Sequence, residues 1–187
     1  MLTSRFEEAL IYAFDLHKNQ TRKSISVPYF AHLMGVAALV LEANGDEDTG
    51  IAALLHDAVE DQGGLATLEE IRKRFGERVA GIVEICSDTF VTPKPPWRKR
   101  KAEYMERLHT APADARLVSV ADKLYNVRTT IDALRTDGER VWDRFKGGKD
   151  GTLWYYRTLV DVFSETGSDG ITEEYIRAVV TLEQLAE

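Results

Sequence analysis

Four ionisable side chains follow an apolar run in the middle of the chain. His56, Asp57, Glu60 and Asp61 come directly after residues 51–55, which are all apolar, and no helix-breaking residue interrupts the segment. Such a run predicts a buried helix, and side chains four positions apart on a helix lie one turn apart. We therefore expect all four groups to crowd one end of a single helix.

The residue types in this cluster indicate metal-assisted hydrolysis. An adjacent His-Asp pair can supply an imidazole nitrogen and a carboxylate oxygen to one divalent ion. Such an ion lowers the pKa of its bound water, and Glu60 and Asp61 would then orient or deprotonate that water. The other helices of the chain must supply the remaining ligands and hold them in place.

His32 and Asp122 are the candidates for those remaining ligands. His32 lies in the first turn of a helix predicted over residues 29–44, where a lone histidine beside an apolar face is more often structural. Asp122 lies on or beside the buried stripe of the helix that follows Pro112, and a buried carboxylate needs a partner or a metal. A buried ion pair with Lys or Arg is the competing interpretation. Two imidazoles and two carboxylates suit manganese, iron, magnesium or zinc.

Basic residues occur in segments that could hold an anionic ligand. Arg22 and Lys23 lie in a polar loop, where exposed cations are common. Lys94 lies in a proline-rich loop, and residues 98–101 place four cations in the first turn of a predicted helix. Cations at that end oppose the helix dipole, so something anionic would offset the cost. A solvated basic face that pairs with acids one turn along the same helix is the competing interpretation.

Length and composition limit the possible classes of protein. The 187 residues, of which 44% are hydrophobic, fit one domain over residues 1–187. A formal net charge of -7 argues against a general nucleic-acid or anionic-membrane binder. Cys86 is the single cysteine, so no internal disulfide is possible. The chain shows neither a signal-peptide pattern nor a bilayer-spanning apolar run, so we expect a cytoplasmic protein.

Apolar periodicity predicts an all-α protein of about eight to ten helices, since strand signals are absent throughout. The first helix is expected to end near Asn19 and the last to cover residues 171–186. Gly147–Gly151 reads as a flexible loop before an aromatic-rich helix.

Three segments, taken together and in order, resemble a known family. They are Pro28–Ala37 around His32, Ala53–Asp61 around the His-Asp pair, and Val120–Asn126 around Asp122. This set resembles the HD-domain hydrolases of the RelA/SpoT type, and is most similar to their small stand-alone alarmone hydrolases. The motif-bearing part covers about residues 5–165, and three ordered motifs are more specific than one His-Asp pair.

The resemblance implies an all-helical HD-domain bundle with one metal ion, manganese, and a pair of acids that positions the nucleophilic water. The implied metal ligands are His32, His56, Asp57 and Asp122, and the implied acids are Glu60 and Asp61. The implied reaction removes the 3′-pyrophosphate of guanosine tetra- or pentaphosphate (ppGpp or pppGpp) and leaves GDP or GTP. The implied nucleotide contacts are Arg22, Lys23, Lys94, Asn126 and, by a looser alignment, Lys149.

Two other functions remain open at this point. The first is an HD-domain phosphohydrolase that acts on another nucleotide, such as a nucleoside monophosphate or NADPH. The second is a sensor that binds the nucleotide without cleaving it. Glu60 and Asp61 argue against a sensor, because two carboxylates would repel the phosphates of a ligand that is only bound.

Overall fold

The computed structural model describes residues 1–22, 26–90, 93–166 and 170–187, and it confirms the all-α class. Within these residues the regular elements are helices, and the one isolated β-bridge joins Thr21 to Pro28. The elements are α1 Ser4–His17, α2 Tyr29–Glu42, α3 Glu47–Leu55, α4 Ala58–Asp61, α5 Leu65–Phe75, α6 Glu77–Cys86, α7 Trp97–His109, α8 Ala113–Asp137, the 3-10 helix η1 Gly138–Arg144, α9 Gly148–Thr166 and α10 Gly170–Ala186.

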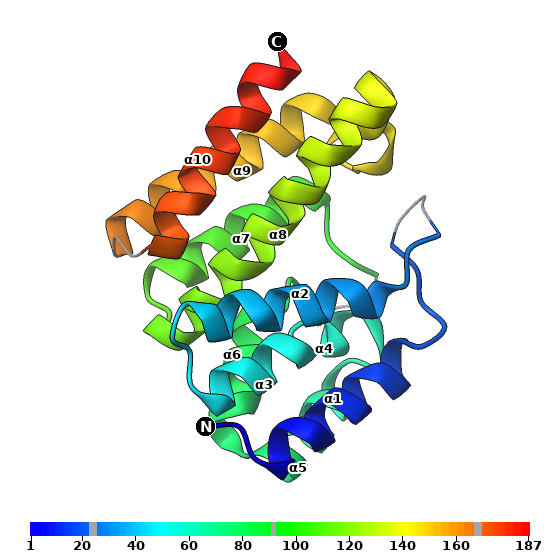
Figure 1. The fold of residues 1–187 in the computed structure, drawn as a ribbon, viewed down its shortest axis with the longest axis vertical. Coiled ribbons are helices and arrows are strands. Elements are labelled where there is room, and N and C mark those ends of the chain that lie inside the picture. Colours follow the sequence, from blue (N-terminus) through cyan, green and yellow to red (C-terminus); the bar gives the residue numbers. More distant parts are fainter. Residues whose placement is uncertain (23–25, 91–92, 167–169) are drawn as a thin grey trace.

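Helix α8 connects the two parts of the fold (Figure 1). It has 25 residues and is therefore about 37 Å long. It packs against α2, α3 and α6 on one side of the molecule, and against η1, α9 and α10 on the other. Asp122 lies near the middle of α8 and is buried, so this carboxylate sits inside the protein where the helices meet.

Helix α3 lies in the core and leads to the predicted site. Every residue from Thr49 to Leu55 is buried, and α3 packs against α1, α2, α6 and α8. Its first turn is capped by Asp46, whose Oδ1 accepts from the backbone N–H of Thr49 at 3.0 Å. A capped and fully surrounded helix has little freedom to move, so the residues that follow Leu55 have a fixed position.

The prediction of one continuous helix over residues 51–61 is wrong. Helix α3 ends at Leu55 and α4 begins at Ala58, which leaves His56 and Asp57 at the junction. The imidazole Nδ1 of His56 lies 2.7 Å from the carbonyl oxygen of Ala53, in the last turn of α3. Carbonyl groups at a helix end lack intrahelical partners, so this contact with the side chain helps to end α3.

The prediction of a loop over Gly147–Gly151 is wrong for residues 148–151, because α9 begins at Gly148; Gly147 lies in the turn before it. The ring of Trp97 packs on this first turn. A Cβ atom at Gly147 would lie 2.8 Å from that ring, and one at Gly151 would lie 3.3 Å from it. These two glycines therefore allow α7 to approach the start of α9 closely, and Gly151 does so without interrupting the helix. The last helix begins at Gly170, close to its predicted start.

Spanning a membrane requires a helix that is both long and apolar. Among the helices of the described residues, none meets both conditions.

Candidate metal centre

The structure brings together the four predicted metal ligands. They come from α2 (His32), from the junction between α3 and α4 (His56 and Asp57) and from α8 (Asp122). The Nε2 atom of His56 lies 3.0 Å from Asp57 Oδ2 and 3.7 Å from Asp122 Oδ1. The Nε2 atom of His32 lies 3.5 Å and 3.3 Å from the same two oxygens. Two imidazole nitrogens and two carboxylate oxygens thus face one another across three separate segments.

The cluster is buried, but Asp57 is more exposed than the other three residues. The side chains of His32 and His56 are 1% and 2% exposed, and that of Asp122 is 9% exposed. The side chain of Asp57 is 22% exposed. A small reactant could therefore approach from the side of Asp57, while the other three residues form the inner wall.

Unpaired nitrogen atoms show that these residues fit a metal ion. The Nε2 atoms of His32 and His56 are buried and make no well-formed hydrogen bond with the described residues. The contact of His56 Nδ1 with Ala53 requires the proton on Nδ1, which leaves the Nε2 lone pair free to coordinate. An unpaired polar atom in the interior is costly, and metal coordination would remove that cost.

The spacing of the four atoms supports the same conclusion. Metal–ligand bonds of about 2.1 Å place two ligand atoms about 3.0 Å apart at a right angle and about 3.4 Å apart at a tetrahedral angle. The four nitrogen–oxygen distances run from 3.0 to 3.7 Å. His32, His56 and Asp57 form a group whose ligand atoms all lie within 4.8 Å of one another, and Asp122 adjoins this group through the two imidazoles. A divalent ion fits among His32, His56 and Asp57, and Asp122 Oδ1 faces the same two imidazole nitrogens.

Neighbouring side chains hold the two carboxylates in place. The hydroxyl of Tyr29 donates to Asp57 Oδ2, and the Tyr29 ring lies edge-on to His32 with centroids 5.5 Å apart. Asp122 Oδ1 accepts from Asn126 Nδ2 at 2.6 Å, and Oδ2 pairs with Lys123. The sequence suggested either a metal ligand or a buried ion pair for Asp122. The structure shows it both in the ligand cluster and paired with Lys123.

The pKa values of the residues in the cluster depend strongly on one another's charge. Burial alone would raise the pKa of Asp122, but Lys123 and the two imidazoles hold it well below its usual value. Burial would likewise raise the pKa of Asp57, and His56 instead keeps it well below its usual value. The pKa of His56 is lowered by burial and raised more strongly by the two carboxylates, so it lies well above normal, and a bound cation would take the place of the proton on Nε2. Two carboxylates that stay ionised in the interior favour a bound cation.

The two predicted catalytic acids lie on α4, directly after the ligand pair, and differ in their partners. Glu60 Oε1 accepts from Lys94 Nζ at 2.8 Å, and Oε2 accepts from the backbone N–H of Asp88 at 3.3 Å. Asp61 Oδ2 accepts from the side-chain amide of Gln20 at 2.7 Å. Burial and the nearby charge of Asp57 raise the pKa of Asp61, which makes it a better proton acceptor.

Three of the five predicted nucleotide-binding residues are connected to this centre. Arg22 donates to Asn126 Oδ1 at 2.6 Å, and Asn126 in turn donates to Asp122, while Lys94 pairs with Glu60. Lys149 is instead paired with Glu139 at 3.2 Å, and the structure does not join it to the cluster. Lys23 lies outside the described residues.

The basic turn at the start of α7 has an anionic partner within the chain. Asp88, which is 6% exposed, pairs through Oδ2 with Arg100 and, at 3.3 Å, with Lys101. Lys99 instead pairs with Glu103 one turn along the helix, as expected for a solvated face. Burial, with a contribution from Lys123, lowers the pKa of Lys101 to about 7. A buried acid therefore offsets part of the cost of placing cations at this helix end.

The sequence did not predict several residues that lie around the centre. A Cβ atom at Gly35 would overlap the ring of Tyr125, and that ring lies edge-on to His32 with centroids 5.0 Å apart. Gly35 therefore allows α8 to approach α2 next to a metal ligand. A glycine inside a helical pattern is a recognised sign of close approach and could have been used to find it. Gln20 and Tyr29 gave no such signal.

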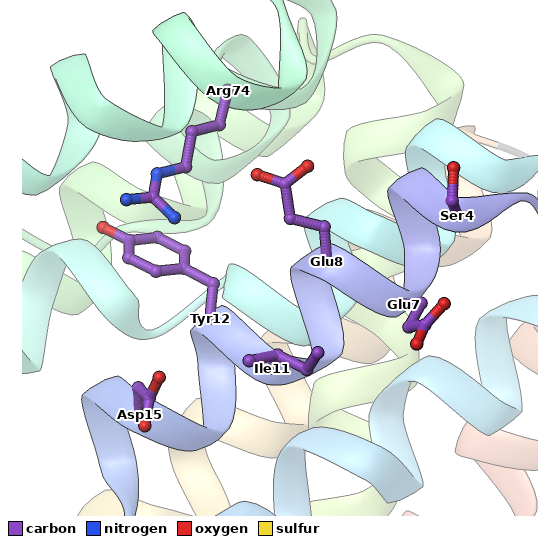
Figure 2. A pocket seen from close by; sticks show the side chains of 7 residues that line it. All are labelled: Ser4, Glu7, Glu8, Ile11, Tyr12, Asp15 and Arg74. Carbon is purple, nitrogen blue, oxygen red and sulfur yellow. The ribbon is translucent and has the colours of Figure 1, made fainter.

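A surface cavity of about 250 Å³ lies apart from this centre, on the outer side of α1 and α5. Figure 2 shows Arg74 of α5 lying over the ring of Tyr12, 4.4 Å from its centroid, with Glu8 beside them. Arg74 also pairs with Glu70 at 2.5 Å. None of the predicted site residues lines this cavity, so the cavity does not alter the assignment of the centre.

Comparison with known proteins identifies the family. A family model described as an HD domain matches residues 9–153. The chain belongs to the HD domain family. This confirms the resemblance inferred from the three motifs. An HD domain implies dependence on a divalent metal, and His32, His56 and Asp57 form a group that could hold one.

The HD domain is similar to several characterised proteins. It is 43% identical over 124 residues to the guanosine-3′,5′-bis(diphosphate) 3′-pyrophosphohydrolase MESH1 of Xenopus tropicalis, an alignment that covers 65% of this chain and 66% of that relative. It is 35% identical over 139 residues to the bifunctional (p)ppGpp synthase/hydrolase SpoT of Escherichia coli strain K12, covering 73% of this chain and 19% of SpoT. The alignments thus span just under two thirds of the first relative and a small part of the second.

One solved structure matches almost the whole chain. It is described by the statement that a metazoan ortholog of SpoT hydrolyzes ppGpp and plays a role in starvation responses. The match has a TM-score of 0.79 and 26% sequence identity, and it covers 98% of this chain and 97% of the other. The likeness therefore extends beyond the motifs to the C-terminal helices.

Proposed function

We propose that this HD domain hydrolyses ppGpp to GDP and pyrophosphate, and pppGpp to GTP and pyrophosphate. The observation that carries the proposal is the ligand cluster of α2, α8 and the junction after α3, with two further carboxylates directly behind it on α4. The 43% identity to a relative named for this reaction supports the choice of substrate.

We further propose that His32, His56, Asp57 and Asp122 hold one divalent ion, and that this ion is manganese. When bound, the ion would act as a Lewis acid for the phosphoryl group and would lower the pKa of water. Tyr29 and Asn126 orient the two carboxylate ligands through the hydrogen bonds described above. These contacts reduce the rearrangement that binding would require.

Glu60 and Asp61 are proposed to handle the attacking water. Asp61 would accept a proton from the water, and its raised pKa brings it closer to the range of an effective general base. Glu60 would accept a second hydrogen bond and orient the water. The new oxygen–phosphorus bond forms at the phosphorus attached to the 3′-oxygen. The bond between that phosphorus and the 3′-oxygen breaks. The 3′-oxygen takes a proton from solvent and leaves as the hydroxyl of GDP or GTP, and Asp61 returns its proton to solvent.

Lys94 and Arg22 are proposed to neutralise the phosphates of the nucleotide. Lys94 is 40% exposed and contacts Glu60, so it can reach a phosphate beside the reacting centre. Arg22 lies over the ring of Tyr29 and contacts Asn126, which places a guanidinium next to the ligand cluster. Arginine and lysine that meet phosphates form charge-assisted hydrogen bonds. Lys149 would have to leave Glu139 to take part.

Cytoplasmic location stays a prediction from the sequence.

A product assay tests this function. Purified protein supplemented with manganese is incubated with ppGpp, the nucleotides are separated, and pyrophosphate and orthophosphate are measured in parallel. We expect GDP and pyrophosphate in equal amounts. Release of orthophosphate would instead indicate a phosphatase, to be tested with NADPH and nucleoside monophosphates. No turnover of ppGpp by metal-loaded protein would refute the proposed substrate.

A further inference from the structure

Gln20 lies just beyond the end of α1 and contacts the proposed general base. Its side-chain Nε2 donates to Asp61 Oδ2 at 2.7 Å, across 41 positions of the chain. Asp61 is thereby joined to the segment just after α1, which contributes none of the proposed metal ligands. This contact is independent of the four ligand atoms, so it can be altered without removing a ligand.

The amide of Gln20 is held in one orientation. Its Oε1 accepts from Gln62 Nε2 at 2.6 Å and lies 2.7 Å from His17 Nδ1. If the amide were turned over, its NH₂ group would face the NH₂ group of Gln62, and Asp61 would face an oxygen. The two contacts on Oε1 therefore direct Nε2 toward Asp61.

The backbone of Gln20 is fixed as well. Its N–H donates to the carbonyl oxygen of His17 at 2.9 Å, and its own carbonyl accepts from the N–H of Tyr29 at 2.9 Å. His17 is 1% exposed and its ring stacks on Tyr29, with centroids 5.4 Å apart and planes 16° apart. Tyr29 also donates to Asp57. Gln20 thus belongs to a packed group that reaches both a metal ligand and the proposed base.

The two acids on α4 differ in the charge of their partners. Glu60 is paired with the cation of Lys94, whereas Asp61 is held by the neutral amide of Gln20. A neutral donor fixes the direction of a carboxylate while stabilising its negative charge less than a cation does. An amide is therefore suited to hold a carboxylate that must still accept a proton.

We propose that Gln20 is a positioning residue that directs the Asp61 carboxylate toward the attacking water, and that His17 and Gln62 hold Gln20 in the required orientation. The inference rests on the proposed function for the role of Asp61. The reaction requires Asp61 to meet the water at hydrogen-bond distance, and loss of the Gln20 contact frees its side chain to rotate.

The first test separates turnover from binding. Gln20→Ala is expected to lower kcat about tenfold, with KM changed less than twofold and manganese content unchanged. Lys18→Ala is the matched control, because Lys18 lies at the same end of α1 and pairs with exposed Asp15. The control is expected to retain wild-type kcat. Equal kcat in Gln20→Ala and the wild type would overturn the proposal, as would a loss confined to KM or to metal content.

The second test asks whether Gln20 acts through Asp61. In a double-mutant cycle with Asp61→Ala, adding Gln20→Ala should cause no further loss of kcat, because the group that it positions is absent. The same four proteins are unfolded in urea without metal, and the double variant should lose less stability than the two single variants combined. Additive losses in both measurements would overturn the proposal. Failure of the wild type to cleave ppGpp would refute the proposed function alone. Urea unfolding needs no substrate, so it would still test the contact between Gln20 and Asp61.

Discussion

The ligand cluster and the basic groups around it are built in different ways. The cluster comes from helices and a helix junction in the core, and three of its four side chains are at most 9% exposed. The basic groups lie on loops and helix starts. Lys94 and Lys149 are 40% and 34% exposed, and each is paired with a carboxylate of the same chain. Core packing thus fixes the proposed metal site, whereas the proposed nucleotide contacts are pairs that a ligand can exchange.

This difference has an energetic basis. Exposed ion pairs contribute about 0–1 kcal/mol, so a phosphate can displace a carboxylate from Lys94 at small cost. The buried ligand atoms are held by the packing of α2, α3 and α8, which a small ligand cannot rearrange cheaply. We therefore expect substitutions in the cluster to affect metal binding and turnover together, and substitutions in the basic groups to affect mainly KM.

The largest effect is expected for His56→Ala. Removal of one imidazole from a four-ligand set should abolish stoichiometric metal binding and turnover together. Metal content after dialysis, measured by elemental analysis, and ppGpp hydrolysis provide the two readouts. His109→Ala is the control, since His109 is partly exposed and pairs with Glu165 away from the cluster. Full activity of His56→Ala would show that His56 is not a ligand of the catalytic metal.

A smaller but still large effect is expected for Glu60→Gln. The change leaves the four ligand atoms in place and weakens the orientation of the water, so the metal should remain while kcat falls about 10²-fold or more. Parallel metal analysis and kinetics measure this separation. Glu69→Gln, at an exposed position on α5, provides the comparison. If Glu60→Gln lost metal as completely as His56→Ala, the division between ligands and water-positioning acids would be incorrect.

Gly35→Ala tests the packing that holds the cluster. The added methyl group would overlap the ring of Tyr125 and force α2 and α8 apart beside His32. Overpacking of this kind typically costs about 1–3 kcal/mol of unfolding free energy. Urea unfolding without metal measures the loss, and a metal titration shows whether affinity falls as well. Gly81→Ala is the matched control, because a Cβ atom there meets nothing within 4 Å. Equal stability of the two variants would contradict the proposed role of this close approach.

Lys94→Ala tests whether a basic group paired with a carboxylate of the chain can bind the nucleotide instead. The substitution removes a cation near the phosphates and leaves the ligand cluster intact, so KM for ppGpp should rise about tenfold with metal content unchanged. Lys99→Ala, in the first turn of α7 and paired with Glu103, should change KM less than twofold. Steady-state kinetics at low and high salt measures both. A KM equal to that of the wild type would exclude Lys94 from the nucleotide site.

Lys149→Ala is expected to have the smallest effect. Its side chain is partly exposed and paired with Glu139, not with a residue of the ligand cluster. We expect kcat and KM within twofold of the wild type in the same assay. A rise in KM as large as that of Lys94→Ala would show that Lys149 leaves Glu139 and reaches the nucleotide.

The sequence was informative where residue type and local spacing carry the chemistry. A His-Asp pair after an apolar run, a histidine in a first helical turn and an acid on a buried stripe made His32, His56, Asp57 and Asp122 candidates. The family resemblance then joined them into one ligand set. Helical periodicity likewise predicted the all-α class. The break between α3 and α4 was missed, because it depends on a side-chain contact of His56 that the periodicity does not show.

Contacts between distant segments could not be predicted in the same way. Gln20 reaches Asp61 and Tyr29 reaches Asp57 only because α1 and α2 pack beside α4 and its preceding junction. Glutamine and tyrosine occur on many surfaces, so their types alone indicate no role. The glycines at 147 and 151 were misread because a glycine that permits close packing looks the same in sequence as one that ends a helix.

Anomalous diffraction from crystals grown with manganese tests the central claim most directly. We predict a single strong anomalous peak within bonding distance of His32 Nε2, His56 Nε2, Asp57 Oδ2 and Asp122 Oδ1, and no such peak in crystals of His56→Ala. A peak elsewhere, or an ion bound equally well after the loss of His56, would contradict the assignment of these four residues as the metal site.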